Sequence, residues 1–438
     1  LPHLLLVILP RETEAVRNPA VIAKTRMTPK PFGLPNMVRM VDSIGDTNVS
    51  FRVHKDELSD AAAWVARSLP TKNTQPVLRA VVITADDNGL EFAGFDYEVS
   101  TRVRIGAEVT DPGRVAVAGK VFSDVVGTLP NDVIEVSTDG KAMTLRAKSS
   151  RFELPLIPLD DYPQLPNLPQ VTGRISPALL TSAVTQVAAA AGRDDTLPML
   201  TGIHVEIDGE NVKLTATDRF RLAQRHLTWE PASPNVKADL LIPAKTLLDN
   251  ARTLDTSIDD PVEIAVGAED NIGGEGLFGL HVNSRETTTR MLDADFPNVA
   301  PLLPKQHTSM ASVEVAPLLE AIRRVSLVAD RNAQVRMKFE PGQITLYSSG
   351  ADSGAAEESL QAAFTGSDEL LIAFNAGYLR DGLSVIGTDR VVFGFTEASR
   401  PAIMIPEPEQ LPEAGADGAF PTPDTHFTYL LMPVRLPG

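Results

Sequence analysis

One apolar pattern occurs three times in this chain, and it constrains the fold more than any other feature. Apolar residues stand at relative positions 0, 3, 4, 7 and 11, the spacing that places side chains on one face of an amphipathic helix. The three copies begin at Leu58, Leu180 and Leu318 and end at Leu69, Ala191 and Ala329. A repeat this long predicts tandem domains built from one supersecondary plan.

Each of these helices is followed by short alternating segments that predict antiparallel strands, and then by a second strand, helix and strands. The second helices begin near Phe122, Ala244 and Ala376, and Arg380 interrupts the apolar stripe of the last one. The sequence therefore predicts an α+β fold of six strand–helix–strands units, paired into three domains. The predicted domains cover residues 49–169, 172–304 and 309–438. We expect the last to end in a strand over 427–436, and we expect residues 1–45 to be a disordered or non-native leader, with a true start at Met37 or Met40.

The composition excludes several classes of site. The 438 residues include no cysteine, which rules out disulfides, thiolate nucleophiles and cysteine metal sites and fits a reducing cytoplasm. No apolar run reaches the roughly 18 residues that a membrane-spanning helix needs.

No constellation of catalytic residues is visible either. The stretch from Gly113 to Lys120 has one residue too many for a phosphate-binding loop and lacks the hydroxyl that would bind magnesium. The seven histidines do not have metal-ligand spacing, and the four adjacent aspartate pairs fall in predicted turns. We expect no catalytic residues, no metal and no cofactor.

The charge is distributed unevenly over the repeats. The chain carries 40 basic and 57 acidic residues, a net charge of −17, which argues against a surface that is basic throughout. Over the six predicted helices and the turns after them, however, 11 basic residues balance 11 acidic ones, so the excess of acid lies elsewhere. Basic residues near helix ends are also explained by the helix dipole, but their recurrence favours a weakly basic helical face that contacts phosphates.

Four segments together resemble the bacterial sliding clamp family, the beta subunits of DNA polymerase III. They are Thr217 to Ala223, the Asp-aromatic-Pro ends of the first two domains, and Tyr429 to Leu436. The resemblance covers about Val49 to Gly438. It implies three clamp-type domains per chain and a head-to-tail homodimer closed into a ring, with helices inside and sheets outside. Such a ring encircles duplex DNA as a processivity factor and tethers the replicative polymerase.

The family also implies a pocket between the second and third domains that binds short peptides of the polymerase, the clamp loader and other partners. Carried over by position, that pocket comprises Leu200, Thr217, Arg219, Phe220, Arg221, Leu222, Pro243, Leu248, Leu430, Met432, Pro433, Val434, Arg435 and Leu436. Leu222 and Leu248 could equally be ordinary core residues. Arg219-Phe220 departs from the Gly-His that is more familiar at this place.

The resemblance further assigns two contacts and a location. The ring contact falls on Arg151 and Phe152 in the first domain and on Leu327 and Val328 in the third. The DNA-facing residues are Lys72 and Arg193, with Arg331 added by its repeat position. The location implied is cytoplasmic and nucleoid-associated, and an ATP-driven loader would be a separate protein.

Two alternatives remain open on the sequence alone. The first is an acidic scaffold of repeated domains that binds proteins and not DNA. The second is an enzyme with an unrecognised site at a domain junction. Loss of the protein from linear but not circular DNA would distinguish a clamp from a scaffold.

Overall fold

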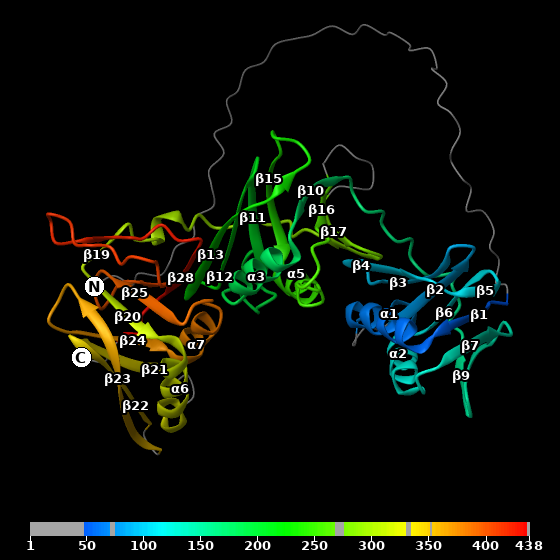
Figure 1. Cartoon of the computed structure of the whole chain (residues 1–438), viewed down its shortest axis with the longest axis horizontal. Helices are drawn as coiled ribbons and strands as arrows, with labels where there is room; N and C mark the ends of the chain where they lie inside the picture. The colour runs from blue at the N-terminus through cyan, green and yellow to red at the C-terminus, as the bar shows by residue number, and fades with distance from the viewer. Residues whose placement is uncertain (1–47, 71–74, 268–275, 330–333, 351–352, 436–438) are drawn as a thin grey trace, which may run out of the picture. The chain divides into compact units, whose positions relative to one another are not determined.

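The computed structural model describes residues 48–70, 75–267, 276–329, 334–350 and 353–435 (Figure 1). The predicted leader over residues 1–45 lies outside these ranges, as do Lys72, Arg331 and Leu436. Within them, no helix has both the length and the apolar character needed to cross a membrane. The chain divides into two compact units, the first ending at Pro163 and the second containing the rest together with Tyr97–Thr101.

Within the described ranges, six strand–helix–strands units follow one another, as the repeat predicts. The first pair is β1 Ser50–His54, α1 Lys55–Ser68, β2 Ala80–Asp86, β3 Gly89–Phe95 and β4 Val99–Ile105, then β6 Gly113–Ala118, α2 Gly119–Thr128, β7 Val133–Thr138, β8 Ala142–Ala147 and β9 Ser150–Pro155. The short strand β5, Glu108–Asp111, lies between them, and a 3-10 turn, Pro76–Arg79, precedes β2.

The second pair has the same order. It is β10 Val171–Ile175, α3 Pro177–Ala188, β11 Gly202–Asp208, β12 Asn211–Thr217 and β13 Arg221–Thr228, then β15 Lys237–Pro243, α5 Ala244–Ala251, β16 Val262–Val266, β17 Leu277–Val282 and β18 Arg285–Arg290. A one-turn helix α4, Pro198–Thr201, and a short strand β14, Glu230–Pro231, are added to this plan.

The third pair completes the repeat. It is β20 Ser309–Glu314, α6 Val315–Val325, β21 Gln334–Glu340, β22 Gly342–Gly350 and β23 Gly354–Thr365, then β24 Leu370–Asn375, α7 Ala376–Ser384, β25 Arg390–Phe395, β26 Ala402–Pro406 and β28 Phe427–Leu431. Two 3-10 turns, Ala300–Leu302 and Ser326–Val328, and a two-stranded ladder of β19 Gln306–His307 with β27 Phe420–Pro421 lie outside the units.

In each domain, the first strand of each unit pairs with a strand of the other unit. The first strand of one unit pairs antiparallel with the strand after the helix of the other, as β1 with β7, β10 with β16 and β20 with β25. The reciprocal pairs are β6 with β2, β15 with β11 and β24 with β21. Neither unit therefore completes a sheet without the other, so the pair forms a single folding domain.

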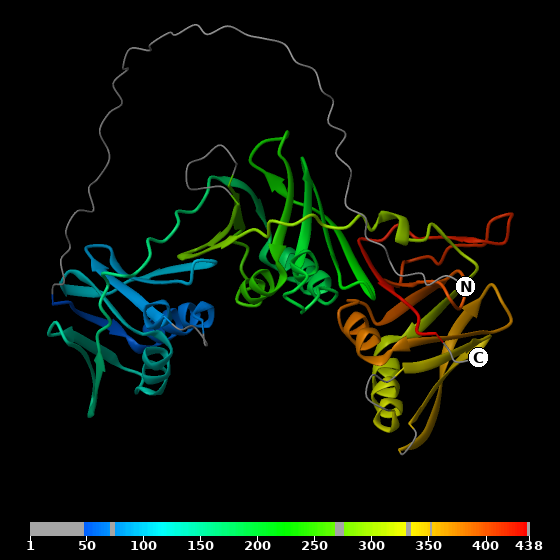
Figure 2. The same ribbon diagram turned by 180° about the vertical axis from the view of Figure 1, so that it is seen from behind.

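The two helices of each domain lie next to each other, as α1 with α2, α3 with α5 and α6 with α7 (Figures 1 and 2). Their apolar stripes are buried against the sheets: Leu58, Leu180 and Leu318 are each at most 5% exposed. Burial of apolar surface, to which these stripes and the facing strand residues both contribute, is the dominant favourable term in folding.

The three repeated helices are shorter than the sequence pattern predicts. Leu69, Ala191 and Ala329, the residues at relative position 11, all lie beyond the last helical residue. In the third domain the Ser326 hydroxyl donates to the Ile322 carbonyl, a 3-10 turn follows, and Ala329 is half-buried. In the first two domains Leu69 and Ala191 are buried although they follow the helix, so the apolar stripe continues into a turn that also packs on the core.

One strand prediction in the third domain needs correction. The strand expected over 427–436 ends at Leu431. The Met432 N–H still bonds to the Phe220 carbonyl at 2.9 Å, in register with the pairing of Arg221 and Leu431, but residues 432–435 are not part of a strand. The third strand after α6, β23, is twelve residues long.

Strand β13 of the second domain pairs with β28 of the third, with Leu222 opposite Leu430. This pairing joins strands of both domains in a twelve-stranded sheet. Hydrogen bonds between the two strands hold the tip of the β12–β13 hairpin beside the C-terminal residues of the chain.

Candidate functional site

The hairpin tip between β12 and β13 is fixed by its own side chains. The Asp218 carboxylate accepts the N–H groups of Phe220 and Arg221 at 3.0 and 3.1 Å. The Thr217 hydroxyl donates to the Arg221 carbonyl at 2.7 Å and accepts the Arg219 N–H at 3.2 Å. Asp and Thr in these positions satisfy the backbone groups that a three-residue loop leaves unpaired. The tip is thus a preformed feature of the hairpin.

Arg221 connects this tip to the third domain. Its side chain is 5% exposed and pairs with Asp218 at 2.8 Å and with Asp381 of α7 at 2.6 Å. The guanidinium also donates to the Tyr429 hydroxyl at 3.3 Å and lies 4.4 Å from the centre of the Tyr378 ring. Burial opposes the charge, yet these partners outweigh it and raise the pKa of Arg221. The cation is therefore held between the two domains.

An apolar surface lies beside this ion-pair network. Phe220 is 52% exposed and stacks on Tyr378 with ring centroids 6.1 Å apart. The residues after β28 run past Phe220 toward β24. The Met432 N–H bonds to the Phe220 carbonyl, and the Val434 N–H bonds to the carbonyl of Ala373 in β24 at 2.8 Å. We call Arg219, Phe220, Tyr378, Met432 and Val434 the junction surface. An exposed aromatic ring on a rigid hairpin, backed by a half-buried ring, suits an apolar anchor residue of a partner.

The structure brings part of the predicted pocket together. Thr217, Arg219, Phe220, Arg221 and Met432 meet through the hydrogen bonds given above.

The other predicted pocket residues occupy three kinds of place. Leu222 and Leu430 are each 1% exposed and belong to a core cluster with Val299 and Ile403. Leu200 is also buried, in α4. Pro243, Leu248 and Pro433 are half-buried, whereas Val434 and Arg435 are exposed. Whether Pro243 and Leu248 belong to the pocket stays a prediction.

Three important residues were missed by sequence reasoning. Tyr378, Asp381 and Tyr429 all contact Arg221, but Tyr378 and Asp381 lie about 160 positions along the chain from it. Tyr429 begins the segment Tyr429 to Leu436 that carries the family resemblance, whereas for Tyr378 and Asp381 the sequence indicates only that the guanidinium of Arg221 has more donors than Asp218 accepts.

Of the predicted DNA-facing residues, Arg193 alone falls in the described ranges. It is exposed in the loop after α3. Cations on the helices themselves are partly neutralised by acids one turn away, as in Lys120 with Asp124 at 3.3 Å and Lys245 with Asp249 at 2.9 Å. Such exposed pairs leave only a weak field for a distant phosphate.

The residues predicted for the ring contact lie at strand edges or next to them. Arg151 and Phe152 are on β9, the last strand of the sheet β5-β1-β7-β8-β9, and Phe152 is 37% exposed. In the third domain Leu327 is 78% exposed. Val328 is half-buried and its carbonyl accepts the Ser353 hydroxyl at 2.7 Å, next to the start of β23.

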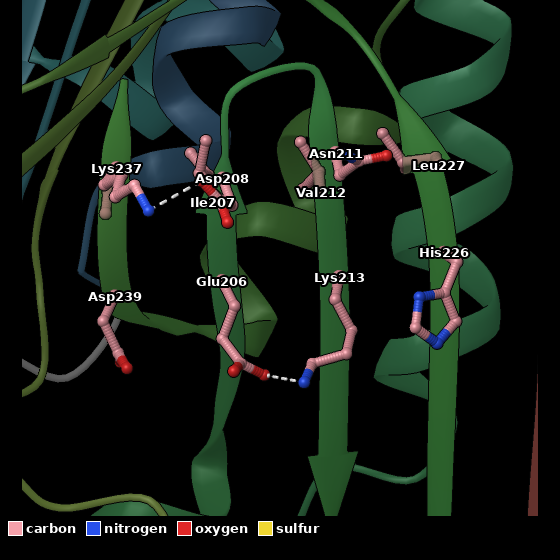
Figure 3. A pocket seen from close by; sticks show the side chains of 11 residues that line it. Glu206, Ile207, Asp208, Asn211, Val212, Lys213, His226, Leu227, Lys237 and Asp239 are labelled. Carbon is pink, nitrogen blue, oxygen red and sulfur yellow. Dashed lines mark ion pairs between the residues drawn. The ribbon is translucent and has the colours of Figure 1, made fainter. Parts of the chain in front are cut away.

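Two surface hollows are lined by none of these predicted site residues. One, of about 400 Å³, lies on the exposed face of β11, β12, β13 and β15, and its charged groups pair with one another, as Lys213 with Glu206 and Lys237 with Asp208 (Figure 3). The other, of about 460 Å³, is lined by residues of β21, β22 and β23. Among the described residues no group of three or more histidine, aspartate or glutamate side chains could hold a metal ion.

Family models for the DNA polymerase III beta subunit match almost all of the folded chain. The N-terminal domain model matches residues 49–166, the central domain model 174–298 and the C-terminal domain model 300–412.

Relatives and solved structures agree with these models. The beta sliding clamp of Streptomyces coelicolor is 43% identical over 390 residues, which cover 89% of this chain and 100% of the relative. The beta sliding clamp homolog GriR of Streptomyces muensis is 40% identical over 385 residues, covering 88% and 99%. The DNA polymerase sliding clamp of Bacillus subtilis and a Pseudomonas aeruginosa sliding clamp bound to griselimycin superpose with TM-scores of 0.78 and 0.76. Each is 25% identical and covers 89% of this chain and 100% of its own.

Proposed function

The chain belongs to the family of the DNA polymerase III beta subunits, the bacterial beta sliding clamps, and we propose from this membership how it works in replication. It is a non-catalytic processivity subunit that encircles duplex DNA as a ring and tethers DNA-processing proteins to it. The observation that carries this function is 43% identity to a beta sliding clamp over that relative's whole length. A tether works by keeping the polymerase at high local concentration near its template.

Closure into a head-to-tail homodimer is supported by two open strand edges. One is β9, which ends its sheet in the first domain. The other is the first part of β23, because residues 354–361 pair with β22 whereas β20 pairs only with residues 362–365. Unpaired edges at opposite ends of a chain form a heterologous contact, and a heterologous contact that closes makes a ring. Arg151, Phe152, Leu327 and Val328 are the contact residues proposed.

Contact with DNA is proposed for Arg193, Lys72 and Arg331. The helical layer is near neutral because its cations have acidic neighbours, and this suits weak, exchangeable phosphate contacts without sequence readout. The strongly acidic remainder of the chain would repel DNA elsewhere.

Partner peptides are proposed to dock on the junction surface together with the remaining predicted pocket residues. The partners are the replicative polymerase, the clamp loader and other proteins with a clamp-binding peptide. We also propose clamp domains at 49–169, 172–304 and 309–438 and a cytoplasmic, nucleoid-associated location.

The test is topological. The protein is assembled by a clamp loader on a nicked circular plasmid, and the complex is passed over a gel-filtration column before and after the plasmid is cut once. We expect the protein to stay with circular DNA and to be lost from linear DNA. Blocking both ends with bound protein should restore retention. Equal retention on open linear and circular DNA would favour the acidic scaffold that does not encircle DNA.

A further inference from the structure

Arg219 has an unusual backbone for its residue type. Its φ of +78° lies in the left-handed region, which glycine enters without steric cost and a residue with a side chain does not. Among the described residues only Tyr97, Lys148 and Asn283 share this property without being glycine. A strained arginine at a functional surface suggests that its side chain has a use.

The hairpin fixes the point from which this side chain begins. The Arg219 N–H is bonded to Thr217, and the Asp218 carboxylate accepts the next two N–H groups of the loop. These bonds restrict the loop, so the backbone of Arg219 stays in one position next to Phe220.

Arg219 has no ion-pair partner within 4 Å in the described part of the chain, and its side chain is exposed. The nearby acids are occupied: Asp218 and Asp381 both pair with Arg221. Asp194 accepts the N–H and hydroxyl of Thr196, and these bonds, followed by the charge of Arg219, lower the pKa of Asp194. Apart from this attraction to Asp194, the Arg219 charge is not paired within the described part of the chain, and it is next in sequence to the exposed Phe220.

We propose that Arg219 makes the junction surface selective for peptides that carry a carboxylate next to their apolar anchor. This inference rests on the proposed peptide docking and concerns which peptides are preferred. An anchor placed on Phe220 brings the flanking peptide residue next to position 219, because 219 and 220 are adjacent in a rigid loop. The chain as a whole carries −17, so attraction for an acidic peptide is confined to places such as this one.

The experiment compares two fluorescein-labelled decapeptides taken from the clamp-binding segment of a replicative polymerase. They differ at one residue beside the anchor, which is Asp in one and Asn in the other. Fluorescence anisotropy gives both dissociation constants for the wild-type protein. We expect the Asp peptide to bind about two- to fivefold more tightly at low salt, the range for an exposed ion pair, and this ratio to fall as salt is raised.

Arg219→Gly and Arg219→Gln should both bring the ratio of the two dissociation constants toward one. Gly also relieves the positive φ, so this variant should fold, and Gln keeps a long polar side chain without the charge. The matched control is Lys148→Gly, which removes a cation at another positive-φ site, in the first domain, and should keep the wild-type ratio.

Equal, measurable binding of both peptides to the wild-type protein would overturn the role of Arg219 and leave peptide docking intact. A ratio that persists in Arg219→Gly and Arg219→Gln would also overturn it. Binding of neither peptide would instead contradict the docking function, and the selectivity inference with it.

Discussion

At the scale of single residues, His307 shows how a buried side chain holds the connector between the second and third domains. It is 1% exposed, and its Nε2 lies 2.8 Å from the Thr422 hydroxyl. That hydroxyl already donates to the Pro304 carbonyl, so the imidazole must be the donor and Nδ1 must be unprotonated. Within the described part of the chain Nδ1 is buried and has no hydrogen-bond partner, and burial lowers the pKa of His307 to about 4.

This histidine predicts a loss of stability in mild acid. In the unfolded chain His307 takes up a proton near pH 6.5, whereas in the folded protein it does so only near pH 4. The free energy of unfolding should therefore be highest above pH 6.5 and fall by up to roughly 3 kcal/mol as the pH approaches 4. Urea unfolding at several pH values measures this slope. His307→Gln does not titrate and should show a shallower slope over the same range, and equal slopes would contradict the assignment.

At the scale of elements, the second helices of the first and third domains differ in how closely they approach their sheets. Gly382 of α7 is buried against β26 and β28, where an added Cβ would come within 2.5 Å of Met404 and 2.6 Å of the Tyr429 ring. Gly127 of α2 is exposed and an added Cβ would meet nothing within 4 Å. The same residue type thus has a packing role in one helix and none in the other.

The pair gives opposite predictions for one substitution. Gly382→Ala should destabilise the protein by about 1–3 kcal/mol, because overpacking exceeds the gain in helix propensity. Gly127→Ala should stabilise it by up to about 1 kcal/mol, since only the propensity changes. Thermal unfolding of both variants against the wild type checks the signs. A stabilised Gly382→Ala would show that α7 can move away from the sheet.

At the scale of the whole molecule, function requires contacts that one chain cannot make with itself. The exposed Phe152 and Leu327 belong to two different domains, and both stand next to open strand edges. Exposed large apolar side chains at such positions are characteristic of interfaces and costly to replace by charge.

The ring therefore predicts a specific change in oligomeric state. Phe152→Asp and Leu327→Asp should each raise the dimer dissociation constant at least about tenfold, because a buried unpaired carboxylate costs more than about 1.4 kcal/mol. Sedimentation velocity at micromolar protein measures the shift toward monomer. Ile258→Asp replaces another exposed apolar residue, 40% exposed, and should remain dimeric. A wild-type protein that sediments as a monomer would argue against the ring.

Much of the fold follows from the order of residues alone. The apolar stripes beginning at Leu58, Leu180 and Leu318 placed the first helix of each domain correctly, because a helical period is a local property of the chain. Turn chemistry such as Asp218 in the β12–β13 loop is likewise local. The ends of the helices were less well predicted, since the stripe continues into turns that also pack on the core.

Local sequence therefore determined the six repeated units, their apolar faces and the hairpin that carries Arg219 and Phe220. Tertiary structure alone decided which strands pair between units, and which residues meet Arg221. Tyr378 and Asp381 reach it because β13 pairs with β28, which lies about 200 residues further along the chain, and because α7 packs against β28. The spacing of apolar residues along the sequence indicates which side chains are buried. The residues that they pack against depend on distant parts of the chain.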